Sequence, residues 1–162
     1  MSAKPPQIVT AALVLPIGML PGELPASAPI HATATKEIER RGADLVLARE
    51  RELGRQPVKQ DFSNNGFDIL TIDSEGDTFR IEIKARIDGA TDFFTTHNEV
   101  ITGKNAAPRY RLVLVSVDPR GPRYDQVRYL HDPFSTVDVG DFESAGIRCD
   151  WLKMWAKGTV PF

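Results

Sequence analysis

Asp68, Glu82 and Lys84 are the residues of this chain whose types and spacing point most directly to chemistry. They lie in two apolar runs, 65–72 and 78–87, separated by a short polar segment that contains a glycine. Two such runs around a glycine-containing turn are typical of a β-hairpin. A three-residue loop would align Asp68 directly opposite Glu82, and strand alternation then places Lys84 on the same face.

The predicted pair of opposed carboxylates determines which chemistry is expected. Directly opposed side chains have Cβ atoms roughly 5 Å apart, and like charges at that separation destabilise a sheet. Two carboxylates and an ammonium on a central strand are therefore costly unless a cation and a substrate use them. We predict a metal site at Asp68 and Glu82 with Lys84 beside it. The alternative is an unrelated α+β protein in which Lys84 only bridges the two carboxylates.

The order of these residues resembles the PD-(D/E)xK nuclease motif, with Asp68 as the lone aspartate and Glu82 and Lys84 as its E-x-K. A wider stretch, about residues 35–135, is similar to the Protein NO VEIN C-terminal domain family. The segments that carry this likeness are Glu50 at the end of a helix, Gly54-Arg55, N-N-G-F-D-I at 64–69, I-E-I-K at 81–84, T-H-N-E at 96–99 and Y-R-L-V-L-V at 110–115.

The resemblance implies an α/β protein with a restriction-endonuclease-like mixed β-sheet core flanked by helices. It also implies an endonuclease module that hydrolyses phosphodiester bonds in DNA, in restriction or in defence against foreign DNA. Asp68, Glu82 and the backbone carbonyl of Ile83 would hold Mg²⁺ or Mn²⁺, which prefer hard oxygen ligands. Lys84 would orient the attacking water and help to deprotonate it. Glu50 would complete the catalytic and metal-binding set, through water or at a second ion.

A helix predicted over residues 35–53 decides how Glu50 is interpreted. Thr33 or Thr35 would cap its start, and Gly54 would end it. The apolar stripe of this helix consists of Ala43, Val46, Leu47 and Leu53. Glu50 lies on that stripe, and an acid on a packing face is uncommon. A role at the metal would explain it, and the alternative is an ordinary ion pair at the edge of the stripe.

Thr96 and Glu99 form a second local pattern. A short strand over 92–95 is predicted to lead into a helix that runs from Thr96 to about residue 104. The spacing Thr96-x-x-Glu99 is that of a capping box, in which each residue satisfies a backbone N–H of the first turn. The capping role explains both residues without any catalysis.

The second half of the chain supplies the rest of the predicted sheet. Residues 110–118 form a near-continuous apolar run, which predicts a central buried strand, and residues 124–130 alternate like a more exposed strand. Trp151 and Trp155 are four residues apart and would share one face of a final helix. Packing of these two rings against the sheet is favoured over a stacking platform for nucleic acid.

Residues 1–32 are predicted to be an extended segment, with a strand at 8–15, ahead of a nuclease-like domain at 33–162. This segment also looks like the region that precedes the domain at the C-terminal end of some large helicases, which would make the chain part of a longer protein. A secretory signal is the alternative, but Pro16 and Gly18 interrupt its apolar core. The same interruptions exclude a membrane span, and we expect an intracellular, cytoplasmic location.

The net charge of the chain, −2, limits how it could bind DNA. A protein that binds DNA unaided usually carries a basic excess, because neutralising phosphates supplies non-specific affinity. Either the basic residues gather on one face, or another domain of the same parent protein, such as a helicase, delivers the DNA. A homodimer would pair two active sites for a double-strand cut. The alternative function is a non-catalytic nucleic-acid-binding or scaffolding domain that retains the nuclease fold.

Overall fold

The computed structural model describes residues 27–61, 66–137 and 145–161, with side chains from residue 35 onward. The predicted strand at 8–15 therefore lies outside the described residues, and the domain boundary at 32/33 stays a prediction. The chain divides into two units, residues 1–34 and 35–162, and all the contacts below belong to the second. None of the described helices is long and apolar enough to cross a membrane.

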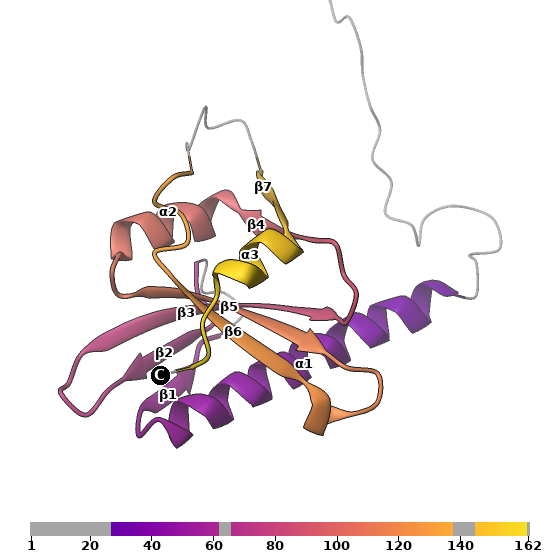
Figure 1. Cartoon of the computed structure of the whole chain (residues 1–162), viewed down its shortest axis with the longest axis horizontal. Coiled ribbons are helices and arrows are strands. Elements are labelled where there is room, and N and C mark those ends of the chain that lie inside the picture. The colour runs from indigo at the N-terminus through magenta and orange to yellow at the C-terminus, as the bar shows by residue number, and fades with distance from the viewer. Residues whose placement is uncertain (1–26, 62–65, 138–144, 162) are drawn as a thin grey trace, which may run out of the picture. The chain divides into compact units, whose positions relative to one another are not determined.

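The chain folds into a mixed sheet with helices on both faces, which confirms the predicted architecture (Figure 1). In chain order the elements are α1 (Ser27–Glu52), β1 (Gln56–Lys59), β2 (Ile69–Ile72), β3 (Thr78–Ile87), β4 (Asp92–Thr96), α2 (His97–Ala106), β5 (Tyr110–Val117), the 3₁₀ turn η2 (Pro122–Tyr124), β6 (Gln126–His131), β7 (Gly146–Asp150) and α3 (Trp151–Lys157). The main sheet has the order β1-β2-β3-β5-β6, and β4 pairs with β7 in a separate two-stranded sheet. Within the main sheet β3 and β5 run parallel and the other neighbours antiparallel.

The β2–β3 hairpin has the predicted register. Ile69 pairs with Ile81, and the ladder continues to the turn, where the Asp73 N–H donates to the Asp77 carbonyl at 3.0 Å. This register extends the alignment at the other end toward Asp68 and Glu82. A slip of one residue would move every apolar side chain of β3 to the opposite face, so burial of one face fixes the pairing.

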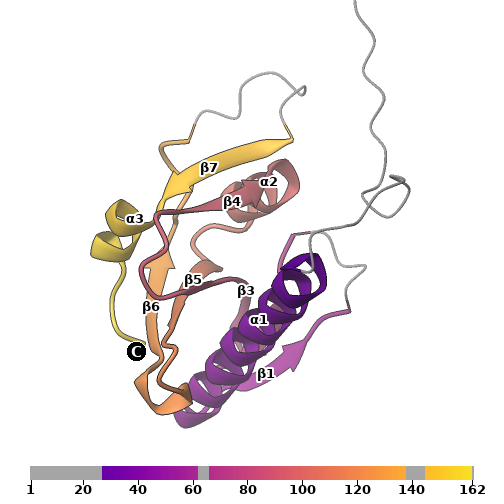
Figure 2. The same ribbon diagram turned by 90° about the vertical axis from the view of Figure 1, so that its right-hand side faces the viewer.

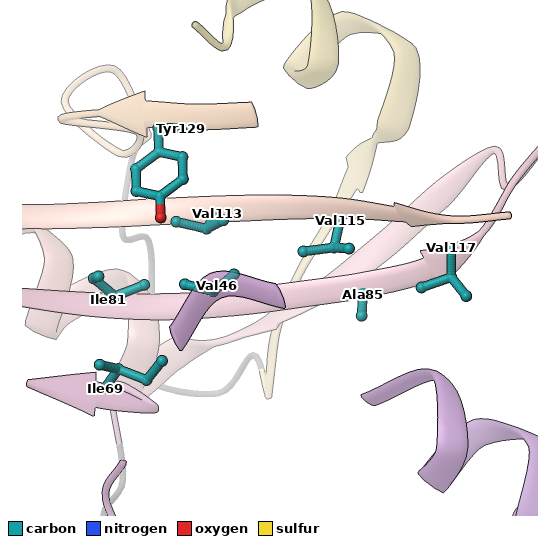
Figure 3. Packing of buried hydrophobic residues seen from close by; sticks show 8 residues of the cluster. All are labelled: Val46, Ile69, Ile81, Ala85, Val113, Val115, Val117 and Tyr129. Atoms are coloured by element: carbon teal, nitrogen blue, oxygen red, sulfur yellow. The ribbon is translucent and has the colours of Figure 1, made fainter. Parts of the chain in front are cut away.

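Two apolar clusters fill the faces of the main sheet, one under α1 and one under α2 and α3 (Figure 2). The first consists of Val46, Ile69, Ile81, Ala85, Val113, Val115, Val117 and Tyr129 (Figure 3). The second consists of Phe93, Val100, Tyr110, Leu112, Leu114, Leu130, Phe134 and Trp151. Full burial of one such aliphatic or aromatic side chain contributes about 1.5–3 kcal/mol. Strand β5 supplies both clusters, as expected for the predicted central strand.

Close contact between α1 and β3 depends on a residue without a side chain. A Cβ placed on Gly42 would lie 2.5 Å from the Ala85 Cβ, so only glycine lets the helix approach the strand this closely. The same helix is tied to the residue just before β6 by an ion pair, in which Arg41 Nη2 lies 2.6 Å from Asp125 Oδ1. Helix α1 is thus held against the sheet by packing and by charge.

The ends of α1 differ from the prediction at one terminus. The helix begins at Ser27 rather than at a cap on Thr33 or Thr35, because the preceding residues continue the helical backbone. It ends at Glu52, and Gly54 follows with a φ of +76°, as predicted for the stop signal. Leu53 is exposed and is not part of the buried stripe, since it lies past the last helical residue.

Strands β1 and β7 were not predicted, whereas the final helix was. The burial pattern of β1 is mostly exposed, and β7 likewise holds few buried residues, so neither has a clear apolar period. Trp151 is buried and packs edge-on against Phe93 with 5.9 Å between ring centroids. Trp155 stacks on Trp151 at 5.6 Å, which confirms that this pair packs within the protein.

Candidate active site

Asp68 is positioned by hydrogen bonds to the backbone of β3. Its backbone N–H donates to the Ile81 carbonyl at 2.8 Å, which extends the β2–β3 ladder by one residue. Its carboxylate Oδ2 then accepts a 2.8 Å hydrogen bond from the N–H of Ile83. Asp68 therefore occupies the edge of β3 beside Glu82, and it remains exposed to solvent.

Lys84 lies between two carboxylates. Its Nζ is 2.7 Å from Glu82 Oε1 and 2.6 Å from Glu99 Oε2. All three side chains are largely buried, with exposed fractions of 11% for Lys84, 6% for Glu82 and 14% for Glu99. Ile81, Ile83 and Ala85 belong to the α1-side cluster, so Glu82 and Lys84 leave β3 on the α2 side.

The charges of this group perturb one another. Burial raises the pKa of Glu82 to about 8, against the charge of Lys84 and with the help of Asp68 and Glu99. The pKa of Asp68 is also raised, because desolvation outweighs the hydrogen bond from Ile83 and the charge of Lys84. Burial alone would lower the pKa of Lys84, but Glu82 and Glu99 raise it above its ordinary value. When all are ionised, the three carboxylates outnumber the ammonium groups that act on them, Lys84 and, at Asp68, Lys59.

Helix α2 and Tyr110 position the chain just before Asp68. The Tyr110 hydroxyl donates to the Gly66 carbonyl at 3.2 Å, and Gly66 has a φ of +139°. A Cβ on Gly66 would lie 2.4 Å from Thr102 Oγ1, so this residue must be glycine for α2 to pack here. The helix that carries Glu99 therefore also supports the segment that presents Asp68.

The structure does not bring Glu50 to this group. Glu50 is completely buried, and its Oε1 accepts a 3.2 Å hydrogen bond from Arg55 Nη1. It shares its helix face with Val46 and lies near Tyr129, whose pKa is raised by burial and then by the charge of Glu50. Val46 and Tyr129 belong to the α1-side cluster, so the sheet separates Glu50 from Glu82. The alternative interpretation, an ion pair, describes its contacts, although the partner is Arg55.

Glu99 is the residue whose place in this group the sequence did not predict. The capping box is present as predicted, with the Glu99 N–H donating to Thr96 Oγ1 and the Thr96 N–H donating to Glu99 Oε2. The same Oε2 also accepts from Lys84. The T-H-N-E segment at 96–99, part of the family resemblance, was the signal that could have identified Glu99. The capping box already explained both Thr96 and Glu99, so no further role was predicted.

The donor set can be tested for a metal ion by its chemistry. Among the described residues, no three His, Cys, Asp or Glu side chains are grouped closely enough to form a metal site as they stand. Asp68, Glu82 and Glu99 offer only oxygen donors, which suit Mg²⁺ or Mn²⁺ rather than zinc. The carboxylates carry an excess of negative charge, so donor type and the sign of the charge both fit a cation. The carbonyl of Ile83 as a further ligand stays a prediction.

Comparison with known proteins agrees with the fold and the motif. The family model described as Protein NO VEIN, C-terminal, matches residues 38–130. No curated protein matches the chain. Among solved structures, a Holliday junction resolvase from Archaeoglobus fulgidus, an archaeal hyperthermophile, is similar with a TM-score of 0.51 and 12% sequence identity. The alignment covers 75% of this chain and 94% of the resolvase, and at that identity the likeness concerns the fold.

Proposed function

The chain belongs to the Protein NO VEIN C-terminal family, and we propose that it is a metal-dependent DNA endonuclease module that hydrolyses phosphodiester bonds. The observation that carries this proposal is that Glu82 and Glu99 both bond Lys84, with Asp68 close enough for its charge to act on them. Buried charges of one sign in excess are costly, and a divalent cation removes that cost. The nuclease-like fold shared with the resolvase supports the same conclusion.

Asp68, Glu82 and Lys84 each have a role in the proposed reaction. Asp68 and Glu82 would hold Mg²⁺ or Mn²⁺ through carboxylate oxygens, with the Ile83 carbonyl as the third donor from the protein. When bound, the metal would supply Lewis acidity at the phosphate and a water of lowered pKa. Lys84 would hold the attacking water in line and place a positive charge beside the phosphate oxygens, where negative charge develops.

A cleavage assay tests the proposal directly. The substrates are supercoiled plasmid, linear duplex and a four-way junction, the last because the resolvase of similar fold is named for that structure. Cleavage should require Mg²⁺ or Mn²⁺ and should fall by at least about 10²-fold per folded molecule in Asp68→Asn and Lys84→Met. Lys153→Met, at an exposed lysine of α3, is the matched control and should cleave like the parent. Cleavage at the parent rate by both site variants would contradict the proposal.

A non-catalytic domain that binds nucleic acid or acts as a scaffold is the second candidate. It is favoured by one contact, since Lys84 Nζ already donates to Glu82 Oε1, and a metal would compete with the ammonium for that oxygen. Titration with Mn²⁺ separates the candidates, because a ligand at 100 times its Kd stabilises the folded state by about 2.7 kcal/mol. An endonuclease should show both Mn²⁺ stabilisation and cleavage, each lost in Asp68→Asn. Absence of both from the parent would favour the second candidate.

The proposal extends to the setting of the module. A net charge of −2 provides no basic excess for gripping DNA, so we place the module in a larger intracellular protein, such as a helicase or a restriction or defence protein, that delivers the DNA. A homodimer would bring two active sites to the two strands. Sedimentation of the purified chain with and without duplex DNA tests both points.

A further inference from the structure

Glu99 does more in this structure than cap the N-terminus of α2. We propose that Glu99 is a positioning residue for Lys84, holding its ammonium in place when Glu82 is engaged by a metal ion. This inference rests on the proposed function for its consequence in catalysis. Its geometric part stands on the contacts of Glu99 alone.

A single oxygen of Glu99 makes two bonds. Oε2 accepts from Lys84 Nζ at 2.6 Å and from the backbone N–H of Thr96 at 3.1 Å. The Glu99 N–H in turn donates to Thr96 Oγ1 at 3.3 Å, so Glu99 is held to Thr96 through both its carboxylate and its backbone. Lys84 is thereby linked to the N-terminus of α2, where the helix dipole favours a negative charge.

The capping box does not require this contact. A glutamine at the same position serves in a capping box equally well, because only an acceptor for one backbone N–H is needed. The bond to Lys84 uses the charge of Glu99, and it lies in a largely buried place where charged pairs are strong. Capping therefore explains why an acceptor is present, and the lysine explains why it is an acid.

Glu82 and Glu99 are not equivalent partners of Lys84. Glu82 lies on the same strand and is a proposed metal ligand, so its oxygens would be shared between the cation and the ammonium. Glu99 reaches Lys84 from a different element and is not needed by the metal in the proposed ligand set. Once a cation binds, Glu99 is the partner left to keep the Lys84 ammonium directed at the attacking water.

Two variants separate the positioning role from the cap. Glu99→Gln keeps the capping acceptor and removes the charge, whereas Thr96→Val removes the cap hydroxyl and keeps the Glu99–Lys84 pair. For Glu99→Gln we expect kcat to fall about 10–100-fold, the usual effect of losing a group that orients a reacting one, with KM and the melting temperature nearly unchanged. For Thr96→Val we expect the melting temperature to fall by about 2–4 °C with kcat unchanged.

A second measurement does not depend on cleavage. In the Mg²⁺-loaded protein, the Lys84 ammonium should give a slowly exchanging ¹H–¹⁵N signal, assigned by its absence from Lys84→Met. The signal should persist in Thr96→Val and vanish in Glu99→Gln. If it persists unchanged in Glu99→Gln and kcat is unaltered, the inference is overturned. A parent that cleaves no DNA refutes the proposed function, while the ammonium signal still decides the role of Glu99.

Discussion

On the α2 face of the sheet one ammonium bonds two carboxylates and a third lies nearby, whereas on the α1 face one carboxylate bonds one guanidinium and a second lies nearby. The first group is Asp68, Glu82, Glu99 and Lys84. The second is Arg55, Arg111 and Glu50, in which Arg55 is bonded to Glu50 and burial, then the charge of Arg55, lowers the pKa of Arg111. Apart from Asp68, which is exposed, both groups are largely buried, and their charges are unbalanced in opposite directions.

The α1-side group has a partner for its excess charge within the protein. The guanidinium of Arg111 lies 3.9 Å from the centroid of the Phe79 ring, and that of Arg55 lies 5.7 Å from it. The face of an aromatic ring attracts a cation by about 0.5–2 kcal/mol, more when water is excluded. On the α2 side the raised pKa of Glu82 lets a proton reduce the excess, and the cation that we propose would do the same. The comparison teaches that burial of charge does not by itself mark a site, and that the sign of the excess and what could balance it distinguish the two groups.

The largest expected difference between the faces is in activity. Lys84→Met should lower kcat/KM for DNA cleavage by about 10²–10⁴-fold, the range for losing a group that moves or steadies a proton. Arg55→Met, a cation removed from the other face, should leave kcat/KM per folded molecule unchanged. The measurement is initial-rate cleavage at saturating Mg²⁺, with the folded fraction determined by circular dichroism. Equal losses in both variants would remove the distinction between the faces.

For stability, the larger loss is expected from a variant on the α1 face. Glu50→Gln removes the charge to which Arg55 is bonded and which raises the pKa of Arg111, and we expect a loss of about 3–5 kcal/mol in the free energy of unfolding. Glu82→Gln removes one of three crowded carboxylates and should be neutral or stabilising at pH 8. Urea denaturation of both variants at that pH measures the difference. A stable Glu50→Gln would show that the α1-side group is not an interdependent network.

The pH dependence of stability should come mainly from the α2 face. The pKa of Glu82 is about 8 in the folded protein and near 4.5 when unfolded, so the folded state holds an extra proton between these values. Its contribution to stability is complete below pH 4.5 and is lost as the pH rises through 8. Glu82→Gln should flatten this part of the profile. Saturating Mn²⁺ should reverse it, because the metal binds the deprotonated carboxylate and stabilises more at higher pH.

The smallest expected effect is the coupling of Arg111 to Phe79. A double-mutant cycle with Phe79→Leu and Arg111→Met should give a coupling of about 1 kcal/mol in the free energy of unfolding. The cycle is needed because each single variant also loses packing contacts. A coupling near zero would mean that the ring does not stabilise the cations, and the contrast between the two faces would then need another explanation.

Sequence patterns predicted what depends on strand alternation. The register that aligns Asp68 with Glu82 follows from the hairpin loop and from the period of two in β3, both of which are local. The same local logic found the capping box of α2 and the packing of Trp151. The family likeness found from the motifs is also confirmed, over residues 38–130.

What the sequence could not predict depends on how the elements dock. The buried stripe of α1 correctly included Glu50, but nothing local says which face of the sheet that stripe covers. Glu99 was assigned to the cap because the contact with Lys84 appears only when α2 packs beside β3. Strand β1 was missed because its extended conformation depends on pairing with β2, whereas its own side chains are mostly exposed and show no apolar period.

The close contact between Gly42 of α1 and Ala85 of β3 connects the packing of the α1 face to the residue beside Lys84 on the α2 face. Ala85 follows Lys84 directly in β3, so the carbon that α1 rests on and the lysine of the acidic group share one peptide unit. A methyl group at residue 42 would force either α1 or that peptide unit to move, because the space between Gly42 and Ala85 is too small to hold it. The packing of α1 behind the sheet therefore limits where the backbone next to this lysine can lie.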